Sequence, residues 1–345
     1  MVKVDYLELH RDALVVDSHN DTIVAHIRRG NLSLERGEEG AARRHSGTIA
    51  FLRGHEEPLP GADYIQIDFP KMRQGGVDAG FFAIDVTLAA KNRLTYALDG
   101  FGYLLGDVEQ TGADVVVVRR ARDIVAAKAD GKLGLVLAVE HADCTERSLN
   151  VLRSLYELGV RSIGLTHNVS SWAADGCLEA RDGVGLTHYG VRLVQEMNRL
   201  GMLVDLAHVS ESAFFHALEV STRPVIFSHG NARALCDHPR NLTDAQLRAL
   251  AASGGVIGVS YVPSFVDRDQ PTLERLLDHV DHIVGVAGVE AVGLGSDFDG
   301  GGTLLSSAAE VPLITKGLLR RGYGEAEVRQ ILGGNTLRVL GEAIG

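Results

Sequence analysis

The chain has 345 residues, of which 45% are hydrophobic, and its 34 basic and 45 acidic residues give a formal charge of −11. This composition is typical of a globular protein, and the acidic balance without any basic stripe argues against nucleic acid as a partner. The sequence contains neither a secretory signal nor an apolar run of about 18 residues, so we expect no membrane partner and a cytoplasmic location.

Three cysteines occur, Cys144, Cys177 and Cys236, and none of them has CxxC spacing. An odd number of cysteines without that spacing indicates neither a disulfide framework nor a cysteine zinc site. We therefore expect three reduced thiols.

Eight short apolar runs with β-branched content recur along the chain, and each predicts a strand. They span Ala13–Asp17, Ala79–Asp85, Leu133–Val139, Ser162–Leu165, Met202–Leu206, Pro224–Phe227, Val256–Ser260 and Ala291–Gly295. Between them, Gly190–Gly201 and Thr272–Gly285 show helical periodicity, with Gly201 and Gly285 as the expected helix ends.

Eight strand–helix units in a chain of this length predict an α/β fold, a (β/α)8 TIM barrel that forms a single domain over residues 1–345. An open Rossmann-like sheet is the alternative, although no GxGxxG motif follows the first strand. The stretch Arg28–Val77 forms a long insertion after the first strand. Within it we expect one short helix that Asp68 caps and that has Pro70 in its first turn.

Polar residues end or follow the predicted strands, where barrel enzymes carry their active sites. They are His19, Asp21, Glu140, His167, His208, His229 and Asp297. Each alone has an ordinary explanation as a structural histidine, a helix cap or an ion-pair partner. Together on a narrow rim, they would repel or desolvate one another unless opposite charge lay between them. The set therefore predicts a divalent metal site.

The HxD spacing of His19 and Asp21 places both side chains on one side of a strand, where they can bind one cation. Imidazole and carboxylate ligands without thiolates suit zinc, with manganese, cobalt and iron as open alternatives. With Glu140, His208 and His229, the candidates exceed the three protein ligands of a usual catalytic zinc. We therefore expect two metal ions that share Glu140 as a bridge.

Motifs of a known family follow one another along the chain. They are DSHND, AVEHAD, RSIGLTHN, LTHYGVRLVQEMNRLGMLVDLAHVS, RPVIFSH, HPRNLTD, VGLGSDFDG and ILGGNTLRVL. In these motifs the chain resembles the renal (membrane) dipeptidase family, binuclear zinc peptidases with a barrel of the amidohydrolase type. The resemblance runs nearly end to end, and it is to the cytosolic bacterial members in particular.

Carried over residue by residue, the resemblance implies two zinc ions per chain. It implies that their ligands are His19, Asp21, Glu140, His208 and His229. On the substrate side it implies His167, Arg240 and Asp297, of which only Arg240 was not already a candidate from the strand pattern. We add Tyr261 as a substrate-binding candidate, with a packed core aromatic as the alternative.

These residues predict a metal-dependent dipeptidase in which a hydroxide that bridges the two zinc ions attacks the peptide carbonyl. We expect His167 to stabilise the oxyanion, Asp297 to pass a proton to the leaving amine, and Arg240 to hold the C-terminal carboxylate. Whether the C-terminal position takes a D-residue is left open. Hydrolysis of an N-acyl amino acid, lactam or lactone is one alternative, and a non-catalytic metal-binding scaffold is another.

Two positions depart from the pattern of many relatives. His141 and Ala142 replace a glycine pair after Glu140, and Gly230 replaces a serine after His229. We expect both changes to affect the shape of the pocket more than its capacity for metal. We also expect His141 and Asp299 to orient ligands, and the family further implies a homodimer.

Overall fold

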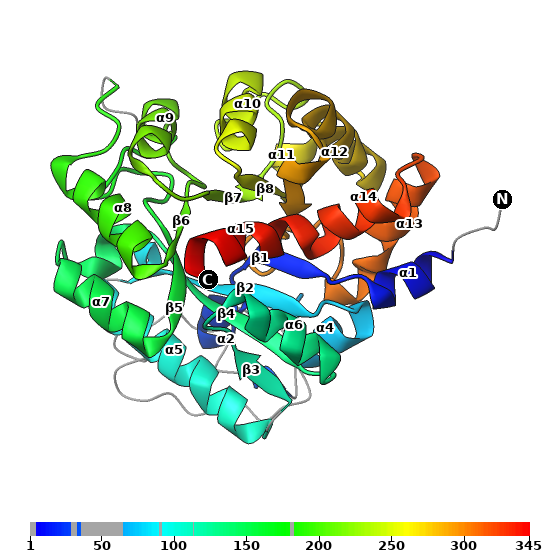
Figure 1. Cartoon of the computed structure of the whole chain (residues 1–345), viewed down its shortest axis with the longest axis horizontal. Helices are drawn as coiled ribbons and strands as arrows, with labels where there is room; N and C mark the ends of the chain where they lie inside the picture. Colours follow the sequence, from blue (N-terminus) through cyan, green and yellow to red (C-terminus); the bar gives the residue numbers. More distant parts are fainter. Residues whose placement is uncertain (1–4, 29–32, 36–64, 90–91, 113, 180–182) are drawn as a thin grey trace.

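The protein is described by a computed structural model that covers residues 5–28, 33–35, 65–89, 92–112, 114–179 and 183–345. Within these ranges one parallel sheet closes on itself through a pairing between β2 and β4 (Figure 1). Its strands are β1 (Val16–Asn20), β2 (Ala79–Asp85), β3 (Val115–Val117), β4 (Leu133–Glu140), β5 (Val160–Gly164), β6 (Leu203–Asp205), β7 (Ile226–Gly230), β8 (Val256–Val259) and β9 (Val292–Leu294).

Eight of these strands form the closed ring, in the order β1, β2, β4, β5, β6, β7, β8, β9 and back to β1. This ring confirms the predicted TIM barrel and excludes the open sheet. β3 was not predicted, although Val115–Val117 form a β-branched apolar run. It pairs with the first residues of β4, Leu133 to Leu135, and lies outside the ring.

Helices surround the ring and cover its outer face (Figure 1). They are α1 (Tyr6–Asp12), α2 (Thr22–Arg28), α4 (Phe69–Gly75), α5 (Arg93–Gln110), α6 (Ala121–Ala129), α7 (Leu149–Leu158), α8 (His188–Leu200), α9 (Glu211–Val220), α10 (Asp244–Ala252), α11 (Pro263–Val266), α12 (Leu273–Ala287), α13 (Pro312–Arg320), α14 (Glu325–Arg329) and α15 (Asn335–Ile344). Short 3-10 turns are η2 (Val86–Leu88), η3 (Ala142–Thr145), η4 (Val289–Ala291) and η5 (Ala308–Glu310), and η6 (Gln330–Gly334) is π-helical. No helix among the described residues is long and apolar enough to cross a bilayer.

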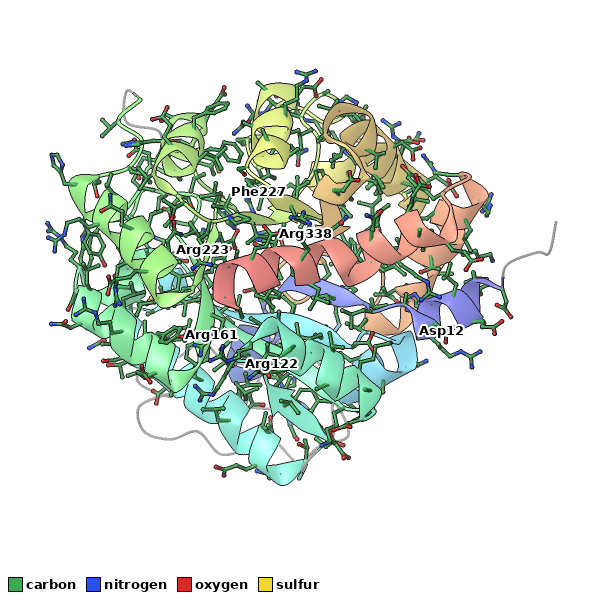
Figure 2. All side chains as sticks on the ribbon, in the orientation of Figure 1. Asp12, Arg122, Arg161, Arg223, Phe227 and Arg338 are labelled. Carbon is green, nitrogen blue, oxygen red and sulfur yellow. The ribbon has the colours of Figure 1, made fainter. Side chains whose placement is uncertain are left out.

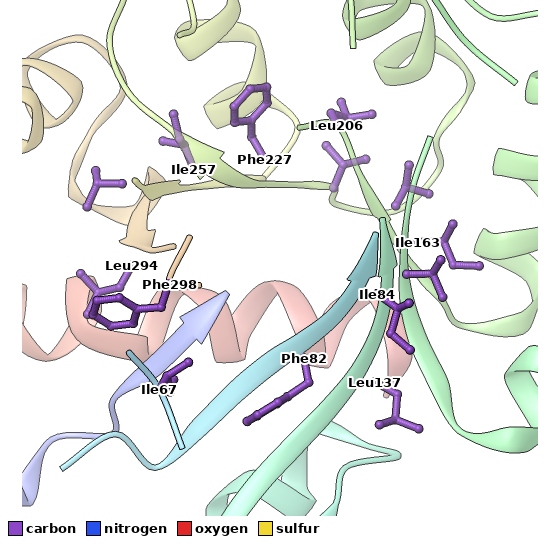
Figure 3. Packing of buried hydrophobic residues seen from close by; sticks show 14 of the residues in the cluster. Ile67, Phe82, Ile84, Leu137, Ile163, Leu206, Phe227, Ile257, Leu294 and Phe298 are labelled. Atoms are coloured by element: carbon purple, nitrogen blue, oxygen red, sulfur yellow. The ribbon is translucent and has the colours of Figure 1, made fainter. Parts of the chain in front are cut away.

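Alternation along the strands divides the core into two apolar clusters, because successive side chains of a strand point to opposite faces. In β2, Phe82 and Ile84 pack in the layer between the barrel and its helices (Figure 3). Phe81 and Ala83 belong to the second cluster, on the inner face of the sheet. The barrel is therefore a packed core, and a ligand can reach it only at an end.

The C-terminal helix α15 covers the N-terminal end of the barrel (Figure 1). Its residues Val339 and Leu340 are fully buried and join the cluster on the inner face. Arginine side chains hold the helix in place (Figure 2). Arg223 donates to the carbonyl of Glu342 at 2.7 Å, and Arg338 donates to that of Gly254 at 2.8 Å. The opposite end of the barrel is left for a site.

Two strands extend three residues further toward their C-terminal ends than predicted. The first was expected over Ala13–Asp17 and spans Val16–Asn20, and the sixth was expected over Pro224–Phe227 and spans Ile226–Gly230. The apolar-run criterion ended them too early, because polar residues at the rim of a barrel continue the strand. His19 and His229 therefore lie in the strands and do not follow them.

The predicted helices are present, with one error at an end. α8 begins after the cap residue Thr187 and ends at Gly201, which adopts a φ of 80°. α12 continues through the expected stop at Gly285 to Ala287, and Gly288 with a φ of 89° ends it. Gly285 is not among the glycines with positive φ, so the backbone continues through it as a helix.

The insertion after β1 falls partly outside the described residues, namely at 29–32 and 36–64. The expected short helix within it is α4, where the Asp68 carboxylate accepts from the backbone N–H of Lys71 at 2.8 Å and Pro70 lies in the first turn. Asp299 holds the chain before this helix, because its carboxylate accepts from the backbone N–H groups of Gln66 and Ile67. This contact positions the insertion, and the role of Asp299 in orienting a ligand stays a prediction.

Candidate metal centre

The five predicted metal ligands converge at the C-terminal end of the barrel. The Nε2 atom of His19 lies 3.5 Å from Oδ2 of Asp21 and 4.0 Å from Oε2 of Glu140. The other oxygen of Glu140, Oε1, lies 2.6 Å from Nε2 of His208 and 3.6 Å from Nε2 of His229. Glu140 thus stands between two groups of ligand atoms, one group at each of its oxygens.

Hydrogen bonds determine which nitrogen of His208 carries its proton. Nδ1 of His208 lies 2.9 Å from Oδ1 of Asn168, which is an acceptor, so Nδ1 is the donor and Nε2 has a free lone pair. The same reasoning holds for His229 through Ser228. The Ser228 hydroxyl donates to Asp205 and so accepts from Nδ1 of His229 at 2.9 Å.

The two bare Nε2 atoms of His208 and His229 lie only 2.9 Å apart. Two lone pairs at that distance repel each other unless a cation lies near them. Nε2 of His19 and Oδ1 of Asp21 are buried, with no hydrogen-bond partner among the residues that the structure describes. These orphaned ligand atoms are what a metal site requires, so the residues fit a divalent metal.

Burial shifts the pKa values of these groups in a consistent way. It raises the pKa of Asp21 to about 6 and that of Glu140 well above its usual range. Burial would lower the pKa of His19, but the carboxylates of Glu140 and Asp21 outweigh it and raise the pKa to about 10. Burial lowers the pKa of His208 and His229 well below the usual range. Positive charge from bound divalent ions would offset the free-energy cost of burying the two charged carboxylates.

The predicted substrate-side residues surround these ligands. The His167 ring stacks on that of His208, with a centroid distance of 4.1 Å. The carboxylate of Asp297 groups with the ring nitrogens of His19 and His229, all within 4.8 Å of one another. The backbone N–H of Asp297 donates to the carbonyl of His19 at 3.0 Å, which joins the ends of β1 and β9.

Arg240 is buried beside the predicted metal ligands. Its Nη2 donates to the carbonyl of His229 at 3.3 Å, and the guanidinium lies 5.4 Å from the ring centre of Phe265. Its Nη1 is buried without a hydrogen-bond partner among the described residues. A buried guanidinium with a free N–H is a receptor for an anionic group such as a carboxylate.

Tyr261 does not lie with these residues. Its side chain is 1% exposed and packs edge-on against Phe298 at 5.4 Å, in the layer between the barrel and its helices. Burial holds the pKa of its hydroxyl well above the usual range. This packing favours the alternative, a packed core aromatic, and the substrate-binding role of Tyr261 stays a prediction.

The two departures from the family pattern have local consequences. His141 adopts a φ of 84°, which favours glycine, and its Nδ1 accepts from the backbone N–H of Asp143. At Gly230, a Cβ atom would collide with the ring of Phe227. Gly230 therefore leaves room for the aromatic ring that underlies Arg240, at 6.0 Å from its guanidinium.

Four further polar residues of the site were missed from the sequence. Asn168, Asp205 and Ser228 set the tautomers of the predicted ligands His208 and His229, and Asp85 lies 4.0 Å from Nε2 of His167. A signal was available for two of them, because Asp205 and Asp85 are acids at the ends of strands that are otherwise apolar. Asn168 and Ser228 carry no such signal, since amide and hydroxyl side chains are common in loops and strands.

Comparisons with known proteins show the family of the chain. A family model described as membrane dipeptidase (peptidase family M19) matches residues 5–344. An uncharacterized dipeptidase of Schizosaccharomyces pombe is 38% identical over 294 residues, which cover 79% of this chain and 71% of that protein. Dipeptidase verJ of Clonostachys rogersoniana is 35% identical over 268 residues, which cover 76% of this chain and 66% of that protein.

A solved structure is also similar. It is a metallopeptidase from Rhodobacter sphaeroides liganded with a phosphinate mimic of the dipeptide L-Ala-D-Ala. It has a TM-score of 0.82 and 27% identity, and the match covers 96% of this chain and 99% of that one. The family resemblance inferred from the motifs is thereby confirmed, and the chain belongs to the membrane dipeptidase family, peptidase family M19.

Proposed function

We propose that this protein is a dipeptidase that hydrolyses the peptide bond of dipeptides at a centre for two zinc ions. The observation that carries the proposal is the buried, incompletely paired guanidinium of Arg240 next to the orphaned ligand atoms. A carboxylate receptor at that position suits a substrate whose C-terminal carboxylate lies one residue from the bond that is cut. Manganese, cobalt and iron remain alternatives to zinc.

His19 and Asp21 would hold one metal ion, His208 and His229 the other, and Glu140 would bridge them. When bound, such a pair supplies a hydroxide as the nucleophile at neutral pH and polarises the peptide carbonyl. The side chain of Arg240 orients the substrate through its carboxylate. These assignments make the protein a hydrolase and not a metal-binding scaffold, because Arg240 and His167 are not needed to hold metal.

Two side chains of the chain would act on the reacting bond. His167 has its pKa lowered by burial, so at neutral pH the ring is uncharged and donates an N–H to the developing oxyanion. The Asp297 carboxylate accepts the proton of the nucleophile and delivers it to the nitrogen of the leaving amine. Both side chains already lie within the cluster.

We further propose that the C-terminal residue of the substrate can have D configuration. The support is the Rhodobacter sphaeroides metallopeptidase, which is liganded with a mimic of L-Ala-D-Ala. The competing function is hydrolysis of an N-acyl amino acid, lactam or lactone on the same site. The homodimer and the cytoplasmic location remain predictions.

Metal analysis and a substrate screen test this function together. We expect two zinc ions per chain after zinc loading, and turnover of a library of dipeptides of mixed stereochemistry. Asp297→Asn should keep both metals and lose turnover. A single metal per chain would contradict the two-metal centre. Hydrolysis of lactams or N-acyl amino acids without any dipeptide would favour the competing function.

A further inference from the structure

Asp85 is a buried carboxylate without a role so far, because it is neither a proposed metal ligand nor one of the residues proposed for the reaction. It is the last residue of β2, it is 8% exposed, and its register partner across the sheet is Glu140. Asp85 therefore lies at the C-terminal end of the barrel beside the bridging glutamate. It is not among the groups whose ligand atoms cluster closely enough to share a metal ion.

Local hydrogen bonds account for only part of this carboxylate. Asp85 caps the turn η2, because its Oδ1 accepts from the backbone N–H of Thr87 at 2.8 Å and both oxygens accept from the Thr87 hydroxyl. A neutral side chain with an acceptor oxygen could cap this turn equally well, so the negative charge of Asp85 is not needed for the cap. No lysine or arginine forms an ion pair with Asp85 in the described part of the chain, and its one ion-pair contact is His167, whose Nε2 is 4.0 Å from Oδ2.

The charge of Asp85 has no counterion beside it at the centre. Two divalent ions would be balanced by the carboxylates of Asp21, Glu140 and Asp297 together with one hydroxide. Asp85 and Arg240 then leave one negative and one positive charge, which balance overall but form no ion pair with each other among the described residues. Buried charge is stable only when it is paired, so a cationic group from outside the chain would complete the site.

The topology of the ring places Asp85 and Arg240 on opposite sides. Three strands separate β2 from β7 in either direction around the ring, so these two strands face each other across the barrel. Arg240 follows β7 and contacts the carbonyl of His229 at the end of that strand. The proposed metal ligands come from β1, β4, β6 and β7, in the space between. A negative group and a positive group thus lie on opposite sides of the centre.

A dipeptide has the complementary shape. Its ammonium and carboxylate groups stand about 7 Å apart when the backbone is extended, with the peptide bond between them. Arg240 at one side of the mouth pairs with the carboxylate, and a carboxylate at the opposite side can pair with the ammonium.

We propose that Asp85 is the receptor for the α-ammonium group of the substrate. With Arg240, it selects a zwitterionic dipeptide over an N-acyl amino acid or a lactam. This inference rests on the proposed dipeptidase function and narrows its substrates to those with a free amino terminus. An acylated substrate would bury the charge of Asp85 without a partner, which is the kind of penalty that gives strong discrimination.

The test compares Ala-Ala with its desamino analogue, propionyl-Ala, in the wild type and in Asp85→Asn. The asparagine keeps an oxygen for the Thr87 N–H and removes only the charge. We expect the wild-type kcat/KM to favour Ala-Ala by about 10- to 100-fold, the value of a charge-assisted hydrogen bond in a buried site. Asp85→Asn should remove this preference by lowering kcat/KM for Ala-Ala, and should leave propionyl-Ala within about twofold.

Asp123→Asn is the matched control. The Asp123 carboxylate also accepts backbone N–H groups at the start of a helix, those of Arg119 and Arg120, but it lies on α6, which packs against α15. The ratio of the two kcat/KM values should not change in this variant. Metal content should equal that of the wild type in both variants, since neither residue is a proposed ligand.

A binding measurement gives a readout that does not depend on turnover. Titration calorimetry with a phosphinate mimic of Ala-Ala and with its N-acetyl derivative should show a preference for the free amine in the wild type. The preference should be lost in Asp85→Asn. This binding measurement decides the role of Asp85 even if the protein hydrolyses neither substrate. The absence of hydrolysis would itself count against the dipeptidase function.

Three results would overturn the role of Asp85. The first is an unchanged preference in Asp85→Asn. The second is an equal fall of kcat for both substrates, because it would mark a residue that positions His167. The third is a wild-type protein that hydrolyses the desamino compound with the same kcat/KM as the free amine, or binds the acetylated compound with the same affinity.

Discussion

The two ends of the barrel are built from opposite kinds of residue. At the N-terminal end, Val339 and Leu340 of α15 pack against Val16 and Leu203 at the starts of strands, and all four are buried and apolar. At the C-terminal end, the buried residues are histidines, carboxylates and an arginine, several with unpaired atoms. Burial therefore stabilises one end, while the other end carries charge that burial opposes.

Backbone conformation shows the same contrast. The non-glycine residues with positive φ in the described ranges are His141, Glu146, Arg147, His208, Asp297 and Asp299. All of them follow the C-terminal ends of strands, and two are a proposed ligand and the proposed acid. Such conformations cost about 1–3 kcal/mol each and persist only where the surrounding structure enforces them. The comparison indicates that the apolar end stabilises the fold, and that the polar end contains the conformations and buried charges that lower stability.

The largest expected effect is at the polar end, in Glu140→Gln. Loss of the bridging carboxylate should reduce the number of bound metal ions and lower kcat/KM by about 1000-fold or more. The metal-free variant should be at least as stable as the metal-free wild type, because a buried charge has been removed. Metal analysis, steady-state kinetics and thermal unfolding of the metal-free proteins check this. If the metal-free variant unfolded at a clearly lower temperature than the metal-free wild type, the buried charge at the polar end would not be destabilising.

The converse is expected at the apolar end, in Leu340→Ala. Removal of a fully buried leucine should lower the free energy of unfolding by about 2–5 kcal/mol, through lost burial and the cavity that remains. The activity per folded molecule should not change, since the C-terminal rim is untouched. Leu98→Ala is the matched control, because Leu98 is 45% exposed and its loss should cost less than about 0.5 kcal/mol. Denaturant unfolding and active-site titration measure both quantities.

The smallest effect concerns His10 of α1, a buried histidine that contacts Thr315 and Gly75. Its ring lies 2.7 Å from the Thr315 hydroxyl and 2.8 Å from the carbonyl of Gly75, and burial lowers its pKa. As the pH falls below 6.5, His10 binds a proton in the unfolded chain but not in the folded chain. The free energy of unfolding therefore falls as the pH falls. The slope is at most about 1.4 kcal/mol per pH unit.

His10→Gln isolates this contribution, because glutamine does not titrate. Between pH 7.5 and pH 5, the metal-free wild type should lose more stability than the metal-free variant, as measured by denaturant unfolding at each pH. Parallel pH profiles for the two proteins would show that His10 does not titrate with unfolding.

Much of the fold could be predicted from the sequence, because alternation and helical spacing are local properties. β2 was predicted with its observed bounds, and β4 with an error of one residue at its end. Errors arose where local rules conflict with the tertiary setting. His19 and His229 extend their strands beyond the apolar run, and Gly285 lies inside a helix that continues to Ala287.

For the site, the sequence by itself determined which residue types stand at the strand ends and which family the motifs resemble. Only the tertiary structure decided that Tyr261 is a core residue, that Arg240 is buried with a free N–H, and that Asp85 lies across the ring from β7. The physical reason is ring closure. It brings residues together that are far apart in the chain, and the burial, tautomers and unpaired charges of those residues follow from that contact and not from their local sequence.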